Sequence, residues 1–389
     1  MSVAPAQHEP RVRDGLTQTA WAFFGARMLL LVVSAVGVGL LAMPDGQPVG
    51  VPGWPARGPD QGWDALVTAT ERQDALWYLR IATDGYAPDD GSAAFFPLYP
   101  LTVRAVAWLP GIGPLGAALL IANAAAFGAL LMLHALTRLE FPDPEIARRT
   151  VLLAALFPTA FFLLAPYTES MFLLLAVSAF WFARSERWGW AALTGAGAAL
   201  TRSIGIVVAV GLAVEAIRQW RGEGRPPLPR IAGAITAGLA PLLYLGAWFV
   251  WERDPTAPLE AQANWSREGW FPLLTVWRAA SLAWRYRTWW LIDVVVVAIV
   301  IVGLVVATRR VAAGYSAYAW AGLLIPLTFP YPDRPLLSAP RFVLILFPAY
   351  WGLARLASRR RGVETALVAG CAAAYGLLAV LFVNWHAIF

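Results

Sequence analysis

Long apolar runs separated by short polar links occupy most of the sequence. A helix needs about 20 apolar residues to cross a bilayer, or somewhat fewer when it is broken and packed against protein. The runs therefore predict an all-α polytopic membrane protein of about 11 transmembrane helices, forming a single integral membrane domain over residues 1–389. The expected spans are 20–43, 114–137, 150–166, 169–184, 188–201, 203–217, 231–251, 291–308, 314–330, 341–357 and 363–383.

Arginines at the ends of the apolar runs indicate how the chain is oriented. With residues 1–18 as a disordered cytoplasmic tail, the predicted spans place every short Arg-rich link on the cytoplasmic side, as the positive-inside rule requires. The two long loops, 44–113 and 252–290, then lie outside the cytoplasm. This agreement supports the predicted topology.

Two stretches need a separate interpretation. Residues 95–112 are apolar but broken by prolines, and a twelfth span there would spoil the Arg pattern. We therefore expect an interfacial helix that lies on the membrane. Arg202 interrupts 188–217, a run that is too long for one span and short for two, and a pair of half-helices would explain it.

The composition agrees with lipid as the solvent, since 59% of the residues are hydrophobic and only 14% are charged. The net charge of +6 does not indicate nucleic-acid binding, because the arginines cluster at the ends of apolar runs. All 30 basic residues are Arg, and Ala and Gly are abundant, which suggests a GC-rich bacterial genome. We therefore expect the chain to lie in a bacterial cell membrane. The lone Cys371 excludes an internal disulfide, and the scattered His residues suggest no metal site.

The first long loop contains a candidate catalytic carboxylate. Asp74, Trp77, Tyr78 and Ile81 share one face of a predicted helix at i, i+3, i+4 and i+7 spacing, and Gly85 offers a helix stop. A carboxylate half-buried among aromatic rings is a better base than one in bulk water. The alternative is that Asp74 caps the helix start, and the spacing does not decide between the two roles.

Four arginines and one glutamate are further candidates. Glu169 lies in a tight outer turn between two spans, where the alternative is a helix start that is capped by Thr168 or Ser170, with Glu169 favoured by the helix dipole. Arg202, within an apolar run, needs a partner such as Glu169 or a lipid phosphate. Arg341 begins an apolar helix where it could hold an anionic headgroup, and Arg285 and Arg287 could do the same before the span at 291. Simple snorkelling to the membrane surface is the alternative for these arginines.

These segments together resemble the GPI mannosyltransferase II (PIG-V) family of GT-C glycosyltransferases. The resemblance runs over most of the chain with its motifs in the right order. It is carried by Asp74-Ala75 through Gly85-Tyr86, Ala94-Phe95-Phe96-Pro97-Leu98-Tyr99-Pro100-Leu101, Pro158 through Ser170 with Tyr167-Thr168-Glu169-Ser170, and Thr201-Arg202-Ser203-x-Gly205. Pro340-Arg341-Phe342 and Asn384-Trp385 are weaker matches.

The resemblance implies a GT-C-like bundle with a helical first extracytoplasmic loop and an active site outside the cytoplasm. It implies transfer of mannose, with inversion, from a polyprenyl-phosphate-mannose donor to a hydroxyl of a lipid-linked or envelope glycan acceptor. Asp74 would be the general base, because an acidic residue of the first outer loop has this role in such enzymes. No cofactor and no metal is expected, and the partners are the lipid-linked donor, the acceptor and membrane lipids.

The resemblance also suggests roles for the remaining candidates. Arg341, Arg202, Arg285 and Arg287 would bind the donor phosphate, and the residues expected to bind acceptor or sugar are Glu169, Tyr167, Trp77, Tyr78 and Tyr86. Eukaryotic members carry Trp before the aspartate and His three residues after it, whereas this chain has Gln73 and Trp77. A bacterium would not make GPI, so the acceptor is left open.

Two other functions compete with the transferase. A transporter or flippase of a polyprenyl-linked sugar would predict repeated halves and charges at the midplane of the membrane. The sequence has no clear repeat, and its acidic candidate lies in a loop. A non-enzymatic scaffold would not need Asp74, Glu169 and Arg202 together.

Overall fold

The computed structural model describes residues 9–40, 50–56, 64–223, 228–263, 267–286, 288 and 290–386. Helices supply nearly all of the regular structure in these ranges, with one isolated bridge between Val51 and Trp54. Six helices in the described part of the chain are long and apolar enough to cross a membrane. The predicted class, an all-α polytopic membrane protein, is confirmed.

The helices fall into a long set and a short set. The long ones are α1 (Glu9–Leu40), α5 (Pro114–Glu140), α7 (Glu169–Arg184), α8 (Trp188–Thr201), α9 (Ile206–Glu223), α10 (Leu228–Glu252), α12 (Pro272–Tyr286), α13 (Leu291–Thr308), α14 (Ala313–Thr328) and α17 (Arg361–Val383). The short ones are α2 (Ala65–Thr68), α3 (Asp74–Asp84), α4 (Leu98–Ala107), α6 (Pro144–Ala155), α11 (Ala257–Ala263), α15 (Ala339–Leu344) and α16 (Pro348–Ala357). Three 3-10 turns are η2 (Ser92–Ala94), η3 (Ala160–Leu163) and η4 (Ser203–Gly205).

Each of the eleven expected spans overlaps one helix or a broken pair of helices, but only six helices of the described residues are long and apolar enough to cross a membrane. The run 188–217 is divided at Arg202, whose backbone is extended, into α8 and α9. The division was expected, but the segment Ser203–Gly222 is by length and composition a full candidate span rather than a half-helix. The runs 150–166 and 341–357 are also divided, because Pro158 and Pro348 cannot continue a preceding helix. Residues 95–112 form only the ten-residue α4, too short to span. The tail expected over residues 1–18 is helical from Glu9, and residues 1–8 lie outside the described ranges.

Close contacts between glycines bring two pairs of helices together. A Cβ on Gly352 of α16 would lie 1.8 Å from the Gly303 carbonyl oxygen of α13. A Cβ on Gly314 of α14 would lie 2.7 Å from the Gly211 carbonyl oxygen of α9. Small residues at such crossings allow backbones to approach closely, which is how helices pack in lipid.

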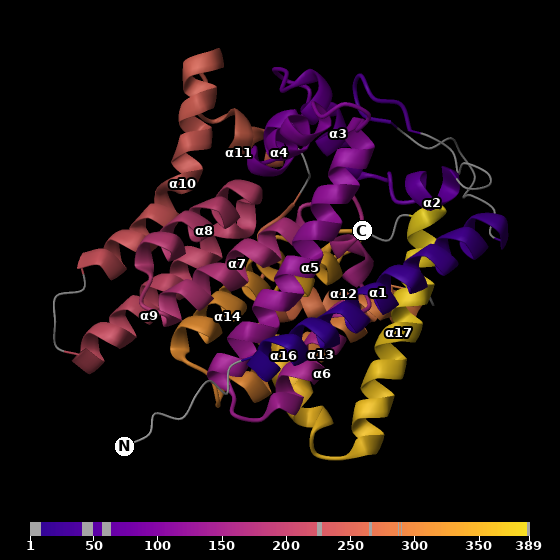
Figure 1. Cartoon of the computed structure of the whole chain (residues 1–389). Coiled ribbons are helices and arrows are strands. Elements are labelled where there is room, and N and C mark those ends of the chain that lie inside the picture. Colours follow the sequence, from indigo (N-terminus) through magenta and orange to yellow (C-terminus); the bar gives the residue numbers. More distant parts are fainter. Residues whose placement is uncertain are drawn as a thin grey trace, which may run out of the picture.

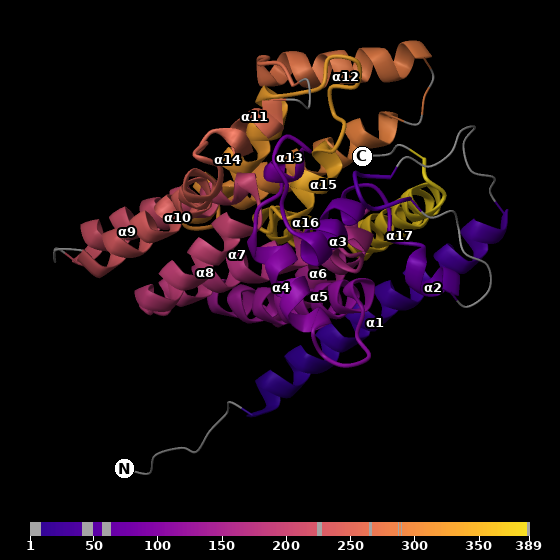
Figure 2. The ribbon, with the colours of Figure 1, turned by 90° about the horizontal axis from the view of Figure 1, so that it is seen from above.

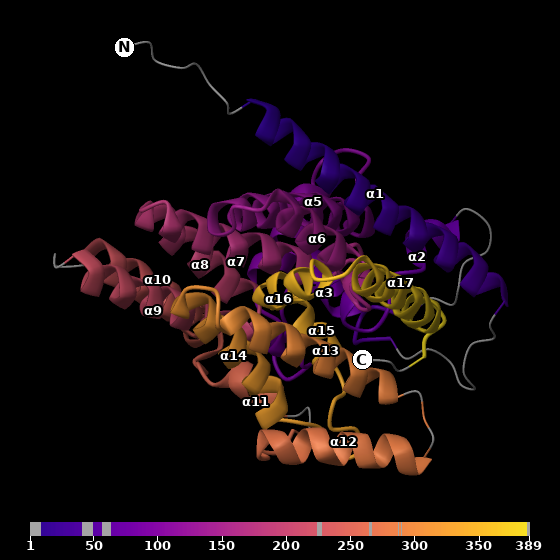
Figure 3. The ribbon, with the colours of Figure 1, turned by 90° about the horizontal axis from the view of Figure 1, so that it is seen from below.

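The short helices of the long loops lie together at one end of the bundle. Figure 1 shows α2, α3, α4 and α11 gathered there, beside the end of α17. Seen along the bundle, α1 and α12 lie on opposite edges of the molecule (Figures 2 and 3). The described part of the first long loop, chiefly residues 64–113, therefore forms a helical layer on the bundle.

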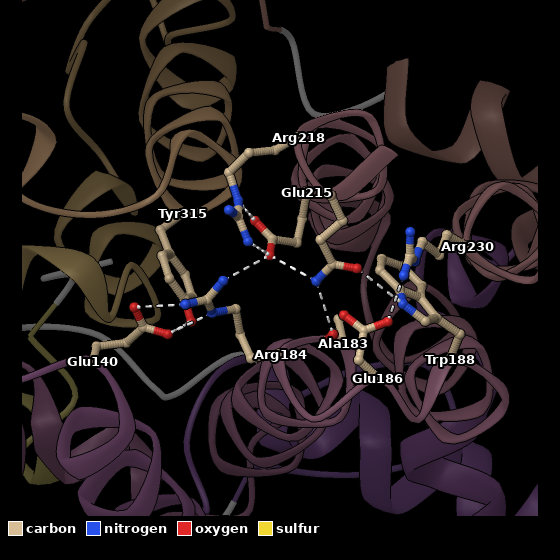
Figure 4. Close-up of polar contacts among 10 residues, drawn as sticks. Glu140, Ala183, Arg184, Glu186, Trp188, Glu215, Arg218, Arg230 and Tyr315 are labelled. Carbon is tan, nitrogen blue, oxygen red and sulfur yellow. Dashed lines mark hydrogen bonds and ion pairs between the residues drawn. The ribbon is translucent and has the colours of Figure 1, made fainter. Parts of the chain in front are cut away.

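The opposite end of α7 is held by a network of ion pairs (Figure 4). Arg184 contacts Glu140 of α5 at 2.7 Å and Glu215 of α9 at 3.1 Å, and Tyr315 of α14 donates to Glu140 at 2.8 Å. Arg218 binds the same Glu215 at 2.7 Å. These contacts tie four helix ends together. Helix α7 thus has a charged residue at each end, Glu169 at its start and Arg184 at its end. The length of the helix separates these two positions by about 22 Å.

Candidate functional site

A pocket of about 550 Å³ opens at the loop end of the bundle, close to the start of α7. Its wall combines α3, α11, the end of α14, α15 and the break between α8 and α9. The polar lining includes Asp74, Tyr78, Arg202, Arg267 and Arg341. The pocket is therefore built from segments that are far apart in the sequence.

Asp74 is the first residue of α3, and its side chain points to an arginine rather than to the helix end. The N-cap position is Gln73, and no side chain caps this helix. Asp74 Oδ2 lies 2.7 Å from Arg341 Nη1, and the aspartate side chain is 20% exposed. The capping alternative for Asp74 is wrong. A carboxylate in the first turn still gains from the helix dipole.

Glu169 is the first residue of α7 and joins two arginines. Its Oε1 lies 2.8 Å from Arg341 Nε and 2.5 Å from Arg202 Nη1, and its side chain is 0% exposed. Glu169, one of the two partners expected for Arg202, is confirmed as its ion-pair partner. The expected cap by Thr168 or Ser170 is wrong, because no side chain caps α7, whereas Glu169 does lie in the first turn, where the helix dipole favours it. Asp74, Arg341, Glu169 and Arg202 thus form one chain of alternating charges.

Aromatic rings hold the two guanidinium groups in place. Arg341 lies 5.3 Å from the ring centre of Tyr167 and 5.7 Å from that of Phe162. Arg202 lies 5.1 Å from the ring centre of Phe342. A guanidinium over an aromatic face is stabilised by the ring quadrupole and fixed in orientation. Both arginines therefore turn inward to carboxylates and rings, so snorkelling does not describe them.

Tyr78 is the polar aromatic residue of the pocket wall next to Asp74. Its hydroxyl lies 3.5 Å from the Thr168 hydroxyl. Burial, followed by the charge of the nearby Asp74 carboxylate, raises the pKa of Tyr78 to about 12. The phenol therefore stays protonated at neutral pH and can serve as a hydrogen-bond donor.

Strained backbone lies next to both ends of the Asp74–Arg341 contact. Gln73, just before Asp74, has φ of 51°, and Ser338, shortly before Arg341, has φ of 65°. Non-glycine residues pay about 1–3 kcal/mol for such conformations, which persist only where the surroundings impose them. The tertiary contacts around Arg72 and Arg341 therefore have to supply this energy.

Arg72 imposes the conformation before α3. Its Nε donates to the Val383 carbonyl at 3.0 Å, its guanidinium lies 5.0 Å from the ring centre of Trp385, and its own carbonyl accepts from the Tyr167 hydroxyl at 2.7 Å. The end of α17 is thereby held against Arg72, which together with Gln73 directly precedes Asp74. The sequence analysis missed Arg72, although its position two residues before the candidate base could have drawn attention to it.

Other predicted residues lie away from the pocket wall or beneath it. Trp77 stacks on Phe95 with ring centres 5.3 Å apart, and Tyr86 packs between Tyr244 and Trp248 while donating to the Phe95 carbonyl. Tyr167 is fully buried under Arg341. None of the three is part of the described pocket lining, so direct contact with a sugar there is not what the structure indicates.

Arg285, one of the two arginines expected to act before the span at 291, is not part of the described pocket lining. Arg285 is exposed near the end of α12, and its guanidinium lies 5.8 Å from the ring centre of Tyr286. Arg287 lies outside the described residues. The position of Arg285 fits the alternative of anchoring at the membrane surface.

A different arginine of the second long loop lines the pocket. Arg267 lies 4.9 Å from the ring centre of Tyr331 and donates to the Phe329 carbonyl at 3.4 Å. It makes no ion pair with a carboxylate in the described part of the chain. Nothing in the sequence distinguishes Arg267 from Arg285 or Arg278, which is why it was missed. Within the described ranges, no three His, Cys, Asp or Glu side chains gather to hold a metal ion.

Comparison with known proteins gives one family and one group of solved structures. Residues 56–220 match the model of the family described as Mannosyltransferase (PIG-V). Among curated proteins no match is found. Similar solved structures include the oligosaccharyltransferase of Archaeoglobus fulgidus with zinc and sulfate, at 14% identity and a TM-score of 0.44, covering 95% of this chain and 53% of that one.

The apo form of the same oligosaccharyltransferase has 12% identity and a TM-score of 0.43, and the match covers 93% of this chain and 56% of that one. The present chain thus spans about half the length of these proteins. The matched family segment carries Asp74, Glu169 and Arg202. The similarity of this chain to the PIG-V mannosyltransferases, first indicated by its motifs, is therefore confirmed over residues 56–220.

Proposed function

We propose that this membrane protein is an inverting glycosyltransferase. It moves mannose from a polyprenyl-phosphate-mannose donor to a hydroxyl of a lipid-linked or envelope glycan acceptor. One observation carries the proposal: Asp74, in the segment that matches the mannosyltransferase family, lines a pocket together with the guanidinium groups of Arg202, Arg267 and Arg341. This combination supplies a base for the acceptor and cations for a leaving phosphate.

Asp74 is the base in the proposed reaction. The acceptor oxygen forms a bond to the anomeric carbon while the bond from that carbon to the phosphate oxygen breaks, and the phosphate leaves with the electron pair. An alcohol is far too weak an acid to ionise alone, so a carboxylate must take its proton as the new bond forms. Asp74 Oδ2 is held by Arg341, whereas Oδ1 has no hydrogen-bond partner among the described residues and is the atom proposed to accept the proton.

Arg341 orients the base and stabilises the leaving group. It binds both Asp74 and Glu169, so the aspartate is fixed in one orientation before substrate arrives. Preorganised charges of this kind contribute to catalysis because they need no rearrangement as negative charge develops. The protonated Tyr78 hydroxyl beside Asp74 is a further donor for a sugar oxygen.

The apolar part of the pocket wall suits a substrate on a lipid. Ile325, Pro326 and Phe329 of the α14 end line the pocket. Ile325 and Phe329 are 37% and 49% exposed, so this wall is also part of the apolar outside of the bundle. A lipid-linked donor could keep its isoprenoid chain in the bilayer and place its headgroup inside, which no water-soluble nucleotide sugar would require.

The proposed active site faces away from the cytoplasm of a bacterial cell. The Arg-rich links follow the ends of α5, α7, α9, α13 and α16, whereas the pocket lies at the start of α7. The positive-inside rule assigns the Arg-rich end to the cytoplasm. The pocket is then extracytoplasmic, where polyprenyl-phosphate sugars would be used.

Transfer of radiolabelled mannose in membranes that contain the Asp74→Asn variant tests the proposal. Asparagine keeps the shape of the side chain but cannot take a proton, so we expect the rate to fall by about 100-fold or more. The matched control is Asp84→Asn, because Asp84 is an exposed carboxylate at the other end of the same helix. A wild-type rate in Asp74→Asn, or an equal loss in both variants, would remove Asp74 as the base. Movement of donor across the bilayer without transfer would favour a flippase.

A further inference from the structure

Three guanidinium groups surround the ring of Phe342. The ring centre lies 5.1 Å from Arg202, 5.5 Å from Arg267 and 5.7 Å from Arg341. Like charges gathered around one apolar ring repel each other unless anions lie between them. The pocket therefore concentrates positive charge at Phe342.

The described carboxylates neutralise only part of this charge. Asp74 and Glu169 pair with Arg341 and Arg202, which leaves two negative and two positive groups in balance. Arg267 is the additional cation, and it has no carboxylate partner in the described part of the chain. Its contacts are the Phe329 carbonyl and the rings of Tyr331 and Phe342. These five described groups thus carry a net charge of one positive unit, which one bound monoanion would neutralise.

We propose that Arg267 is the residue that binds the phosphate of the lipid-linked donor, in place of Arg285 and Arg287. The assignment rests on the proposed function and deepens it. A guanidinium that is held flat by aromatic rings still presents its N–H groups at the edge, and these match two oxygens of a phosphate. The charges of Arg341 and Arg202 are already balanced by Asp74 and Glu169, whereas that of Arg267 is not balanced by a carboxylate in the described part of the chain.

The position of Arg267 also orients the donor. Its hydrogen-bond partner Phe329 belongs to the wall that reaches the apolar outside of the bundle, and Asp74 lies on the α3 side of the same pocket. A phosphate on Arg267 therefore has the lipid-facing wall on one side and the base on the other. The isoprenoid chain leaves past Ile325 and Phe329, and the sugar points inward to Asp74.

Binding of tritiated farnesyl phosphate to the purified full-length protein tests the assignment directly. Loss of a hydrogen-bonded charge contact weakens binding by about 10- to 100-fold, and we expect this for Arg267→Ala. Arg267→Lys keeps the charge and should retain a substantial part of the affinity. Arg278→Ala is the matched control, because Arg278 is an exposed arginine of the adjacent helix that packs on Trp270 outside the pocket. It should bind as the wild type does.

Steady-state kinetics add a second readout. We expect Arg267→Ala to raise the KM for donor while the KM for acceptor stays near the wild-type value. Wild-type binding in Arg267→Ala would overturn the assignment while the proposed function stands. Equal loss in Arg278→Ala would overturn it as well, since a general effect of charge would then explain the result. If the wild-type protein neither binds farnesyl phosphate nor transfers mannose, the proposed function itself fails and the assignment fails with it.

Discussion

The ion-pair chain in the pocket makes a quantitative prediction at Glu169. The Glu169→Gln substitution keeps the size of the side chain and removes its charge. Arg202 and Arg341 are both buried and both contact Glu169 Oε1, at 2.5 and 2.8 Å. Without the carboxylate, Arg202 loses its ion-pair partner among the described residues, while Arg341 keeps Asp74.

The size of the effect follows from the burial. Removal of one partner from a buried ion pair costs about 3–5 kcal/mol, because the other charge stays buried without compensation. Since Glu169 serves two guanidinium groups, we expect a loss of unfolding free energy of about 5 kcal/mol, at the upper end of this range. The charge-balanced double substitution Glu169→Gln/Arg202→Gln removes one charge of each sign. Its loss should be smaller than the sum of the single losses by about 1–3 kcal/mol.

Unfolding by SDS titration in mixed micelles measures these free energies, and mannose transfer measures the accompanying loss of orientation at Asp74. The control is the same double-mutant cycle on Glu186 and Arg230 at the far end of the bundle. Arg230 Nη2 lies 2.9 Å from Glu186 Oε2, and Glu186 is half-exposed. Arg230 is 13% exposed, so this pair is partly open to solvent, mainly through Glu186, and we expect it to couple by less than the fully buried pair, by about 1 kcal/mol or less. Strictly additive losses at Glu169 and Arg202, or equal coupling in the two cycles, would refute the argument that burial gives this cluster its energy.

Two further substitutions test the frame around the site. Arg72→Gln removes the link to the end of α17 and the contact with Trp385, so we expect kcat to fall by about 10-fold with little change in the donor KM. A parallel change in donor KM and kcat would argue for a general loss of structure. Gly352→Ala would place a Cβ 1.8 Å from the Gly303 carbonyl and should cost about 1–3 kcal/mol in SDS titration. Gly362→Ala, where the Cβ would meet nothing within 4 Å, should be tolerated.

The buried charges themselves point to function. A chain of two carboxylates and two guanidinium groups in a membrane bundle is expensive, and apolar residues of similar volume are often at least as stable. The strained backbone at Gln73 and Ser338 adds to the cost, immediately beside the charges that it positions. The second network, around Arg184 in Figure 4, ties helix ends together, and its residues are not part of the lining of the pocket that contains Asp74. The pocket cluster is therefore the better candidate for chemistry.

The sequence by itself determined the membrane-spanning frame. Apolar length and the prolines at 158 and 348 decide where helices begin and end, because each depends on neighbouring residues along the chain. The helix of the first loop, from Asp74 to Asp84, follows from its local pattern in the same way. Asp74 and Arg202 stood out because a charge among apolar and aromatic residues is costly wherever the chain folds.

Only the tertiary structure decided which charges meet. Asp74 and Arg341 are far apart in the sequence, and whether the aspartate caps its helix or binds an arginine depends on where α15 packs. The second long loop contains several arginines with similar neighbours, and packing brings Arg267 to the pocket while leaving Arg285 exposed. Ion pairs and cation–π contacts act over a few ångströms in space, and local sequence carries no record of which distant segments come that close.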